Sequence, residues 1–134
     1  MAWLLLCAAF ALHVLDEAAN GFLLLYNPIV LSLRERLPLL PPPTFRFGAW
    51  LALLITAIIV LALLAPLARA KSGWIIMLGT GFALIMFANG ATHLCISVLR
   101  GEMIPGTWSS PILLAAALNL LGVFYHAGAD SQPR

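Results

Sequence analysis

The chain has 134 residues, of which 63% are hydrophobic and only 9% are charged, and its mean hydropathy is +1.03. Soluble domains are about 45–50% apolar and about 25% charged, so this composition excludes an ordinary soluble domain and predicts an integral membrane protein surrounded by the lipid bilayer. The formal net charge is only +2, and the seven Lys and Arg residues form no basic run, which excludes nucleic-acid binding.

Four apolar segments are long enough to cross a hydrocarbon core about 30 Å thick, which takes roughly 20 residues in a helix. They are residues 3–26, 47–69, 74–99 and 108–126. We expect Asn27-Pro28 to end the first segment and Pro105-Gly106 to lie in the last turn. The pattern predicts an all-α membrane protein, a four-transmembrane-helix bundle that forms a single transmembrane domain over residues 1–134.

The first segment contains the most informative feature of the chain, a polar cluster within an apolar helix. Its members are spaced at i, i+3, i+4 and i+7 and are His13, Asp16, Glu17 and Asn20. This spacing places all of them on one stripe of a helix. A charge at the centre of a membrane span costs about 2.5–3.5 kcal/mol on insertion scales, so such a cluster normally marks a functional site.

We expect the first segment to be a permanent helix and not a cleaved signal peptide. It has no Lys or Arg before its apolar run, and the apolar stretch continues to Tyr26. The basic residues divide almost evenly between the two sides of the four-span arrangement, which leaves the orientation open. The sequence predicts a multi-pass protein, which we expect in a bacterial inner (cell) membrane. An oligomer is compatible with this prediction.

Residues 28–46 form the longest connection, in which leucines alternate with charged residues before a run of three prolines at 41–43. This composition predicts a short amphipathic interfacial segment between the first two transmembrane helices, followed by a stiff extended strip. The segment could cover a site as a lid, although a plain connector is the simpler interpretation.

The third segment carries a second polar stripe, formed by Asn89, Thr92, His93 and Arg100. At 1.5 Å per residue, His93 and Glu17 are expected at roughly the same depth, about 10–14 Å inside the same membrane face. The sequence therefore predicts one intramembrane site that faces the connections at 27–46 and 100–107.

The fourth segment offers fewer candidates. We expect Ser109 and Ser110 to act as N-caps at its start, and Asn119 to face the interior of the bundle. Cys7 and Cys95 lie outside the two polar stripes, so we expect neither a thiolate ligand nor a disulfide.

Two imidazoles with one or two carboxylates are a suitable ligand set for a divalent transition metal such as Zn, Fe or Mn. We predict that His13, Glu17 and His93 bind the metal. Asp16, Glu17 and Asn89 are the candidate catalytic residues, with Asp16 or Asn89 orienting a water or the substrate. The alternative is a structural network in which the same side chains hydrogen-bond across helices.

A family resemblance follows from the short motifs of these two stripes. They are His13-Val14-Leu15-Asp16-Glu17, Asn20-Gly21-Phe22, Asn89-Gly90-Ala91-Thr92-His93 and Pro105-Gly106. Over about residues 10–125 the chain resembles the HXXEE-domain family of small membrane proteins, named for a His, two intervening residues and a Glu pair. The resemblance implies a further Asn and His in a later helix and an enzymatic role. The chain departs from the motif at Asp16, which makes Glu17 the stronger ligand candidate.

Three classes of function fit these residues. The first is a metal-dependent membrane hydrolase or oxidoreductase whose apolar or lipid-like substrate enters between helices. The second is a haem-binding electron carrier with His13 and His93 as axial ligands, although carboxylates beside both ligands are unusual in a haem pocket. The third is a structural or proton-relay membrane protein without catalysis, which would need to oligomerise to form a pathway.

Overall fold

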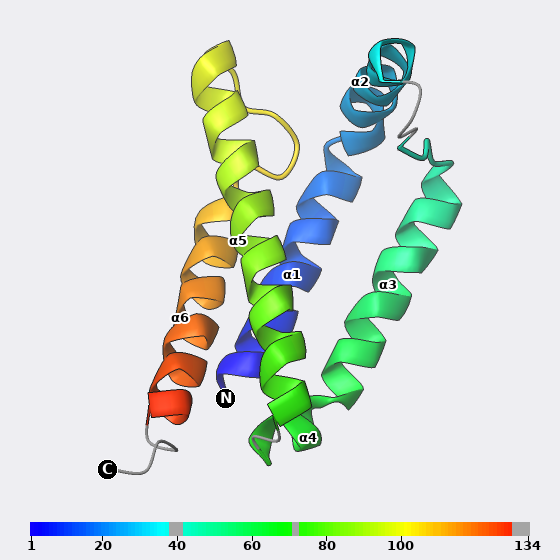
Figure 1. Cartoon of the computed structure of the whole chain (residues 1–134). Helices are drawn as coiled ribbons and strands as arrows, with labels where there is room; N and C mark the ends of the chain where they lie inside the picture. Colours follow the sequence, from blue (N-terminus) through cyan, green and yellow to red (C-terminus); the bar gives the residue numbers. More distant parts are fainter. Residues whose placement is uncertain (38–41, 71–72, 130–134) are drawn as a thin grey trace.

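The computed structural model shown in Figure 1 describes residues 1–37, 42–70 and 73–129. Within these ranges the chain forms six helices and no strand, which confirms the expected all-α fold. The helices are α1 (Ala2–Ala19), α2 (Phe22–Arg36), α3 (Phe47–Leu63), α4 (Ala65–Arg69), α5 (Gly73–Arg100) and α6 (Ser110–Ala129).

The first helix is shorter than the sequence predicts, because it ends at Ala19 and not near Tyr26. Gly21 has a φ of +75°, a left-handed conformation that glycine adopts without steric cost, and it begins α2 in a new direction. The helix α2 then continues through Pro28, so the prediction that Asn27-Pro28 ends the first helix is wrong. The helix that covers the expected amphipathic segment therefore begins earlier, at Phe22.

Asn27 instead connects α2 to the residues just before α3 by two hydrogen bonds. Its side-chain amide donates to the carbonyl of Phe45 at 3.0 Å and accepts from the Phe45 N–H at 3.1 Å. The expected extended strip at 41–43 lies partly outside the described residues, and its described part accepts a hydrogen bond from Arg34 at the carbonyl of Pro42, at 2.8 Å.

The second predicted segment is also divided, since α3 ends at Leu63 and α4 begins at Ala65. Pro66 lies in the first turn of α4, where a missing N–H is tolerated but where the ring would interrupt a helix continuing from α3. The single helix predicted over 47–69 is therefore wrong in this detail. The later two segments, 74–99 and 108–126, correspond closely to α5 and α6.

Two helices, α1 and α5, are long and apolar enough to cross a membrane, while α3 and α6 are shorter apolar helices by the same criterion. The breaks at Gly21 and Leu64 shorten the helices that the sequence suggested. Helix length thus supports two spans in the described part of the chain and does not confirm four.

The bundle is built around α1, which packs against α6 and α3, while α5 packs along α6. The core contains Leu6 and Phe10 of α1, Phe82 of α5, and Leu113 and Leu120 of α6. In Figure 1 the N-terminus, α4 and the end of α6 lie at one end of the bundle, and α2 lies at the other.

The connection between α5 and α6 folds back toward the bundle at the same end as α2 (Figure 1). Gly101 and Gly106 adopt positive φ values of +66° and +88°, which allow the chain to reverse twice in a short stretch. The hydroxyl of Ser97 accepts a hydrogen bond from the N–H of Ile104 at 3.2 Å and fixes the base of this connection. As a result, Gly106, Thr107 and Ser109 are buried, with Gly106 beside His13 of α1 and His93 of α5, whereas Trp108 is exposed.

Candidate metal centre

Three side chains that were predicted as metal ligands meet in the structure. His13 and Glu17 are one turn apart on α1, and His93 approaches from α5. The Oε1 atom of Glu17 lies 3.1 Å from Nε2 of His93 and 3.6 Å from Nε2 of His13. One ligand atom from each residue lies within 4.8 Å of the others. The helices thus place two imidazole nitrogens around one carboxylate oxygen.

All three side chains are removed from solvent, with exposed fractions of 0% for His13, 5% for Glu17 and 4% for His93. The two imidazole rings lie edge to face, with centroids 4.9 Å apart. A carboxylate in such surroundings needs a cationic partner or a proton, because burial of an unpaired charge is costly. Among the described residues, the basic groups beside the Glu17 carboxylate are the two histidines alone, and each is cationic only when both of its ring nitrogens carry a proton.

His13 is held in one orientation by the start of α6. Its Nδ1 atom is 2.8 Å from the hydroxyl oxygen of Ser109, and that hydroxyl donates to Oδ2 of Asp16 at 2.8 Å. The N–H of Ser109 donates to the same carboxylate oxygen at 3.0 Å. Because the Ser109 hydroxyl donates its proton to Asp16, the Ser109 oxygen accepts a hydrogen bond from Nδ1–H of His13. This pattern assigns the tautomer whose Nε2 lone pair faces the other side chains of the centre.

Asn89 occupies the other side of the His13 ring. Its side-chain amide nitrogen lies 3.0 Å from Nε2 of His13 and donates to that atom in the tautomer assigned above. Asn89 is one turn before His93 on α5, so the same helix supplies both groups. The structure therefore brings Asn89 to the site through its hydrogen bond with His13.

Gly106 closes the centre from the connection between α5 and α6. A Cβ atom at this position would lie 2.7 Å from Nδ1 of His93 and 3.0 Å from Cε1 of His13, so only a glycine leaves room for both rings. Nδ1 of His93 is buried and has no hydrogen-bond partner among the described residues. Phe22 packs beside the same ring, with centroids 5.8 Å apart.

A model of the protein family described as "Protein of unknown function with HXXEE motif" matches residues 3–120. The chain belongs to this family. Comparison with curated proteins and with solved structures gave no match.

The structure gives the two acidic positions of the HXXEE motif different surroundings. Glu17, the second position, faces His93, whereas Asp16, the first, faces the start of α6 through Ser109. Oδ1 of Asp16 also accepts a hydrogen bond from Asn20 at 2.8 Å. In the part of the chain that the structure describes, Asp16 contacts the histidine cluster only through Ser109, whose backbone N–H and hydroxyl both donate to its carboxylate.

The outer members of the predicted polar stripes do not reach the centre. Thr92 is exposed and its hydroxyl donates to the carbonyl of Ala88 at 2.8 Å. Arg100 is exposed and pairs with Glu102 at 3.4 Å. Asn20 is exposed because α1 has ended before it. The part of each stripe that lies in the cluster is therefore a single turn of helix.

Sequence analysis missed the role of Ser109, which it interpreted as an N-cap. Its hydroxyl donates to Asp16 and that of Ser110 donates to the carbonyl of Gly106 at 2.7 Å, and among the described residues no backbone N–H donates to either hydroxyl as a capping bond would require. The prediction that Asn119 faces the interior is also wrong, because Asn119 is exposed while Ala116 and Leu120 form the buried face of α6. The position of Ser109 at the predicted membrane face of the site was the available signal.

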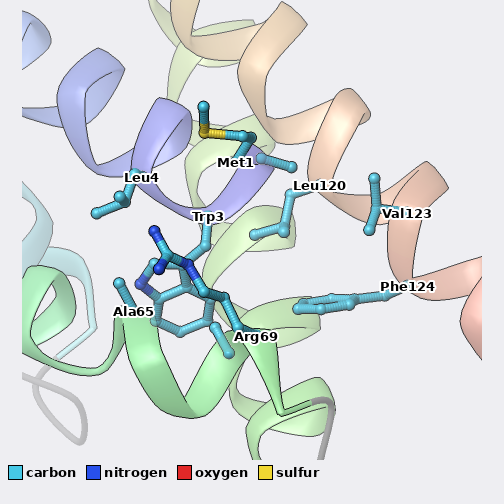
Figure 2. A pocket seen from close by; sticks show the side chains of 10 residues that line it. Met1, Trp3, Leu4, Ala65, Arg69, Leu120, Val123 and Phe124 are labelled. Carbon is cyan, nitrogen blue, oxygen red and sulfur yellow. The ribbon is translucent and has the colours of Figure 1, made fainter.

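A separate pocket lies at the opposite end of the bundle and is shown in Figure 2. It has a volume of about 240 Å³ and is lined by Trp3, Arg69 and Phe124, among others. No residue of the HXXEE motif lines it. The histidine–glutamate centre and this pocket are therefore independent features of the fold.

Proposed function

We propose that the chain is a metal-dependent membrane enzyme in which His13, Glu17 and His93 hold one divalent transition metal, Zn, Fe or Mn. The observation that carries this proposal is the buried Glu17 carboxylate with an imidazole nitrogen on each side, at 3.1 and 3.6 Å. Two histidines and a carboxylate that leave further positions open are a common donor set of catalytic zinc and non-haem iron sites.

The contacts around this donor set also support metal binding. Metal-ligating histidines usually donate their second N–H to an oxygen that fixes the ring, and His13 makes this contact with Ser109, which Asp16 supports in turn. The unpartnered Nδ1 of His93 has lost its contact with water, at a cost of about 1–3 kcal/mol for such a group. Such a cost is typical of residues that are retained for a function.

A divalent metal at this position would supply Lewis-acid activation of a water or a substrate oxygen, and Fe or Mn would add redox chemistry. The protein residues provide the rest. Asn89 donates to Nε2 of His13, the nitrogen whose lone pair a bound metal would take, so metal binding would release this amide to orient a water or a substrate by a hydrogen bond. Asp16 positions His13 through Ser109. The reaction class that follows is hydrolysis or oxidation of an apolar or lipid-like substrate.

Membrane location is supported by the two helices of spanning length and by the outer surface of the bundle. Large apolar side chains are exposed on each long helix, for example Leu15, Ile59, Ile85 and Leu118. Soluble monomers rarely expose apolar surface of this extent. We propose that α3 and α6 also span the membrane, since even the 17 residues of α3 cover about 26 Å. The protein is then a multi-pass protein, which we place in a bacterial inner membrane.

The geometry supports a metal ion over the haem alternative. In a haem with two axial histidines, the macrocycle lies between the two imidazoles. Here the two rings are in edge-to-face contact at 4.9 Å between centroids, and Glu17 contacts both. The contacts from Asp16 through Ser109 to His13 and on to Glu17 also form a continuous polar series, which the proton-relay alternative would require. The metal content of the purified protein distinguishes the proton-relay alternative from the metal-dependent enzyme.

The experiment is element analysis by mass spectrometry of the purified protein in detergent. Wild type is compared with the double variant His13→Ala, Glu17→Gln and with His126→Ala, which removes an exposed histidine of α6 outside the centre. We expect nearly one Zn, Fe or Mn per chain in wild type and in the His126 variant, and none in the double variant. A folded wild-type protein without metal after growth in metal-replete medium would refute the proposal.

A further inference from the structure

A small cavity lies directly beside the Glu17 carboxylate and has a volume of about 140 Å³. Glu17 is its only charged lining residue among those described, and Phe22, Leu23, Phe47 and Trp50 form apolar walls. It is located where α1, α2 and the first turn of α3 meet. The cavity therefore adjoins the proposed metal centre through one of its ligands.

The local backbone and a cluster of aromatic rings build this cavity. The left-handed turn at Gly21 lets Phe22 point back toward the bundle. The Phe22 ring lies 5.9 Å from that of Trp50 and 5.8 Å from that of His93, as measured between centroids. A second aromatic contact, between Phe47 and Trp50 at 6.0 Å, forms the wall on α3. One ring thus contacts both the cavity wall and a ligand of the proposed metal.

The chemistry of the walls determines what can occupy the cavity. An ordered water needs two to four polar partners, and cavities lined by apolar side chains stay dry or bind apolar molecules. If a methylene group takes about the same volume as a water molecule in the liquid, roughly 30 Å³, the cavity holds about five methylene groups. This volume suits one segment of a linear chain, whereas a fused polycyclic ring system such as a sterol contains far more carbon atoms.

We infer that the cavity binds the segment of a linear hydrocarbon chain next to the reacting group of the substrate. This inference rests on the proposed metal-dependent function and narrows its substrate class to single-chain amphiphiles, such as fatty acyl compounds. The reacting group then lies at Glu17, where the cavity meets the centre, and the aromatic walls hold the first carbon atoms of the chain in a fixed direction.

The test is photo-crosslinking of the wild-type protein in lipid nanodiscs, with the modified residues identified by mass spectrometry. One probe is a fatty acid that carries a diazirine a few carbon atoms from its carboxylate, and the other is a sterol that carries a diazirine. We expect the fatty acid to modify Phe22, Leu23 or Trp50 and the sterol not to modify them. Modification by the fatty acid mainly in the apolar groove between α3 and α5, at Trp74 or Met77, would overturn the inference.

A cavity-filling variant provides the matched comparison. Leu23→Trp places a larger side chain in the cavity, and Leu31→Trp makes the same change at an exposed position of α2 that does not line it. We expect labelling of the cavity residues to fall at least about tenfold in the first variant, equivalent to about 1.4 kcal/mol of binding, and to stay unchanged in the second. Equal labelling of both variants would overturn the inference.

Metal content is measured on the same samples, so that the two proposals can fail separately. Retained metal in Leu23→Trp shows that the variant is folded and that loss of labelling results from the filled cavity. Metal in wild type without labelling of the cavity would overturn the chain-binding site alone. Labelling of the cavity in a wild-type protein without metal would support the chain-binding site and overturn the proposed metal chemistry.

Discussion

The contact between His13 and Ser109 gives the sharpest prediction from the centre. Ser109→Ala removes the acceptor of Nδ1–H of His13, a side chain that is 0% exposed, so the donor has no water to replace the lost partner. A buried donor without a partner costs about 1–3 kcal/mol. Loss of such a supporting contact also weakens metal binding about 10–100-fold, or about 1.4–2.7 kcal/mol. We therefore expect both lower stability and lower metal affinity.

The assay is competition for the metal with a chelator of known affinity, together with the thermal unfolding midpoint in detergent. The matched control is Ser110→Ala, which removes a buried hydroxyl from the adjacent residue and a hydrogen bond to Gly106 of 2.7 Å but makes no contact with His13. Both variants should lose stability, and only Ser109→Ala should lose metal affinity. Equal metal affinities in the two variants would show that Ser109 does not position His13.

Three further predictions follow from the same geometry. Gly106→Ala should abolish metal binding because its Cβ displaces the two imidazole rings, whereas Gly101→Ala, with a similar positive φ and open space around it, should keep the metal and lose only about 1–3 kcal/mol of stability. Glu17→Gln should abolish metal binding, and Asp16→Asn should weaken it about 10–100-fold in the chelator assay. Asn27→Ala should lower the free energy of unfolding by about 1–3 kcal/mol for two hydrogen bonds and leave the metal content unchanged.

Each of these predictions has an outcome that contradicts it. Metal retained in Gly106→Ala at the level of Gly101→Ala would show that the loop does not determine the spacing of the rings. Equal metal affinities for Glu17→Gln and Asp16→Asn would contradict the division of roles between the two acids. Loss of metal in Asn27→Ala would mean that the packing of α2 on α3, and not only the side chains at the centre, controls the site.

The central pairs of the site were predictable from the sequence because helical periodicity is strong in an apolar background. One helical turn separates His13 from Glu17, and one turn separates Asn89 from His93. The two side chains of each pair therefore lie on the same face of their helix and point toward the bundle together. Polar groups in an apolar helix need polar partners. In the sequence, the stripe of the third segment is the one expected at the same depth as that of the first, so the two stripes were predicted to meet.

The different directions of Asp16 and Glu17 follow from angles that the sequence analysis treated too broadly. At about 100° per residue, Asp16 lies about 60° to one side of His13 and Glu17 about 40° to the other. The structure places α6 on the first side and α5 on the second. A stripe of polar residues can therefore serve two neighbours, and only the arrangement of the helices determines which residue meets which neighbour.

Backbone breaks and loop conformations were the parts that the pattern did not determine. The Asn20-Gly21 pair is a common turn signal, but the apolar run that resumes at Phe22 favoured one continuous helix, and that continuity hid the break. The burial of Ser109 depends on the path of residues 101–109, which results from two positive φ values and from a hydrogen bond to Ser97. These are tertiary features without a periodic signal in the sequence.

The polar contacts alone do not account for the presence of two carboxylates in this centre. At the middle of a membrane each would cost about 2.5–3.5 kcal/mol, whereas a hydrogen bond between membrane helices contributes about 0.6 kcal/mol on average. Asp16 and Glu17 together make three contacts to other helices or their ends, two with Ser109 and one with His93, which are too few to offset that cost. This imbalance predicts that the centre is kept for a function and not for stability.

The prediction can be tested with the double variant Glu17→Met, His93→Leu, which replaces the carboxylate and the partnerless imidazole by apolar side chains of similar size. Buried ionic groups can often be replaced in this way without loss of stability. We expect the variant to bind no metal and to be at least as stable as wild type stripped of metal by a chelator. Leu6→Ala, which removes a fully buried core side chain, should lose about 2–5 kcal/mol and show that the assay detects a structural defect. If the double variant loses as much stability as Leu6→Ala, the prediction is wrong. The polar contacts of the centre would then stabilise the bundle, and the centre would be a structural network.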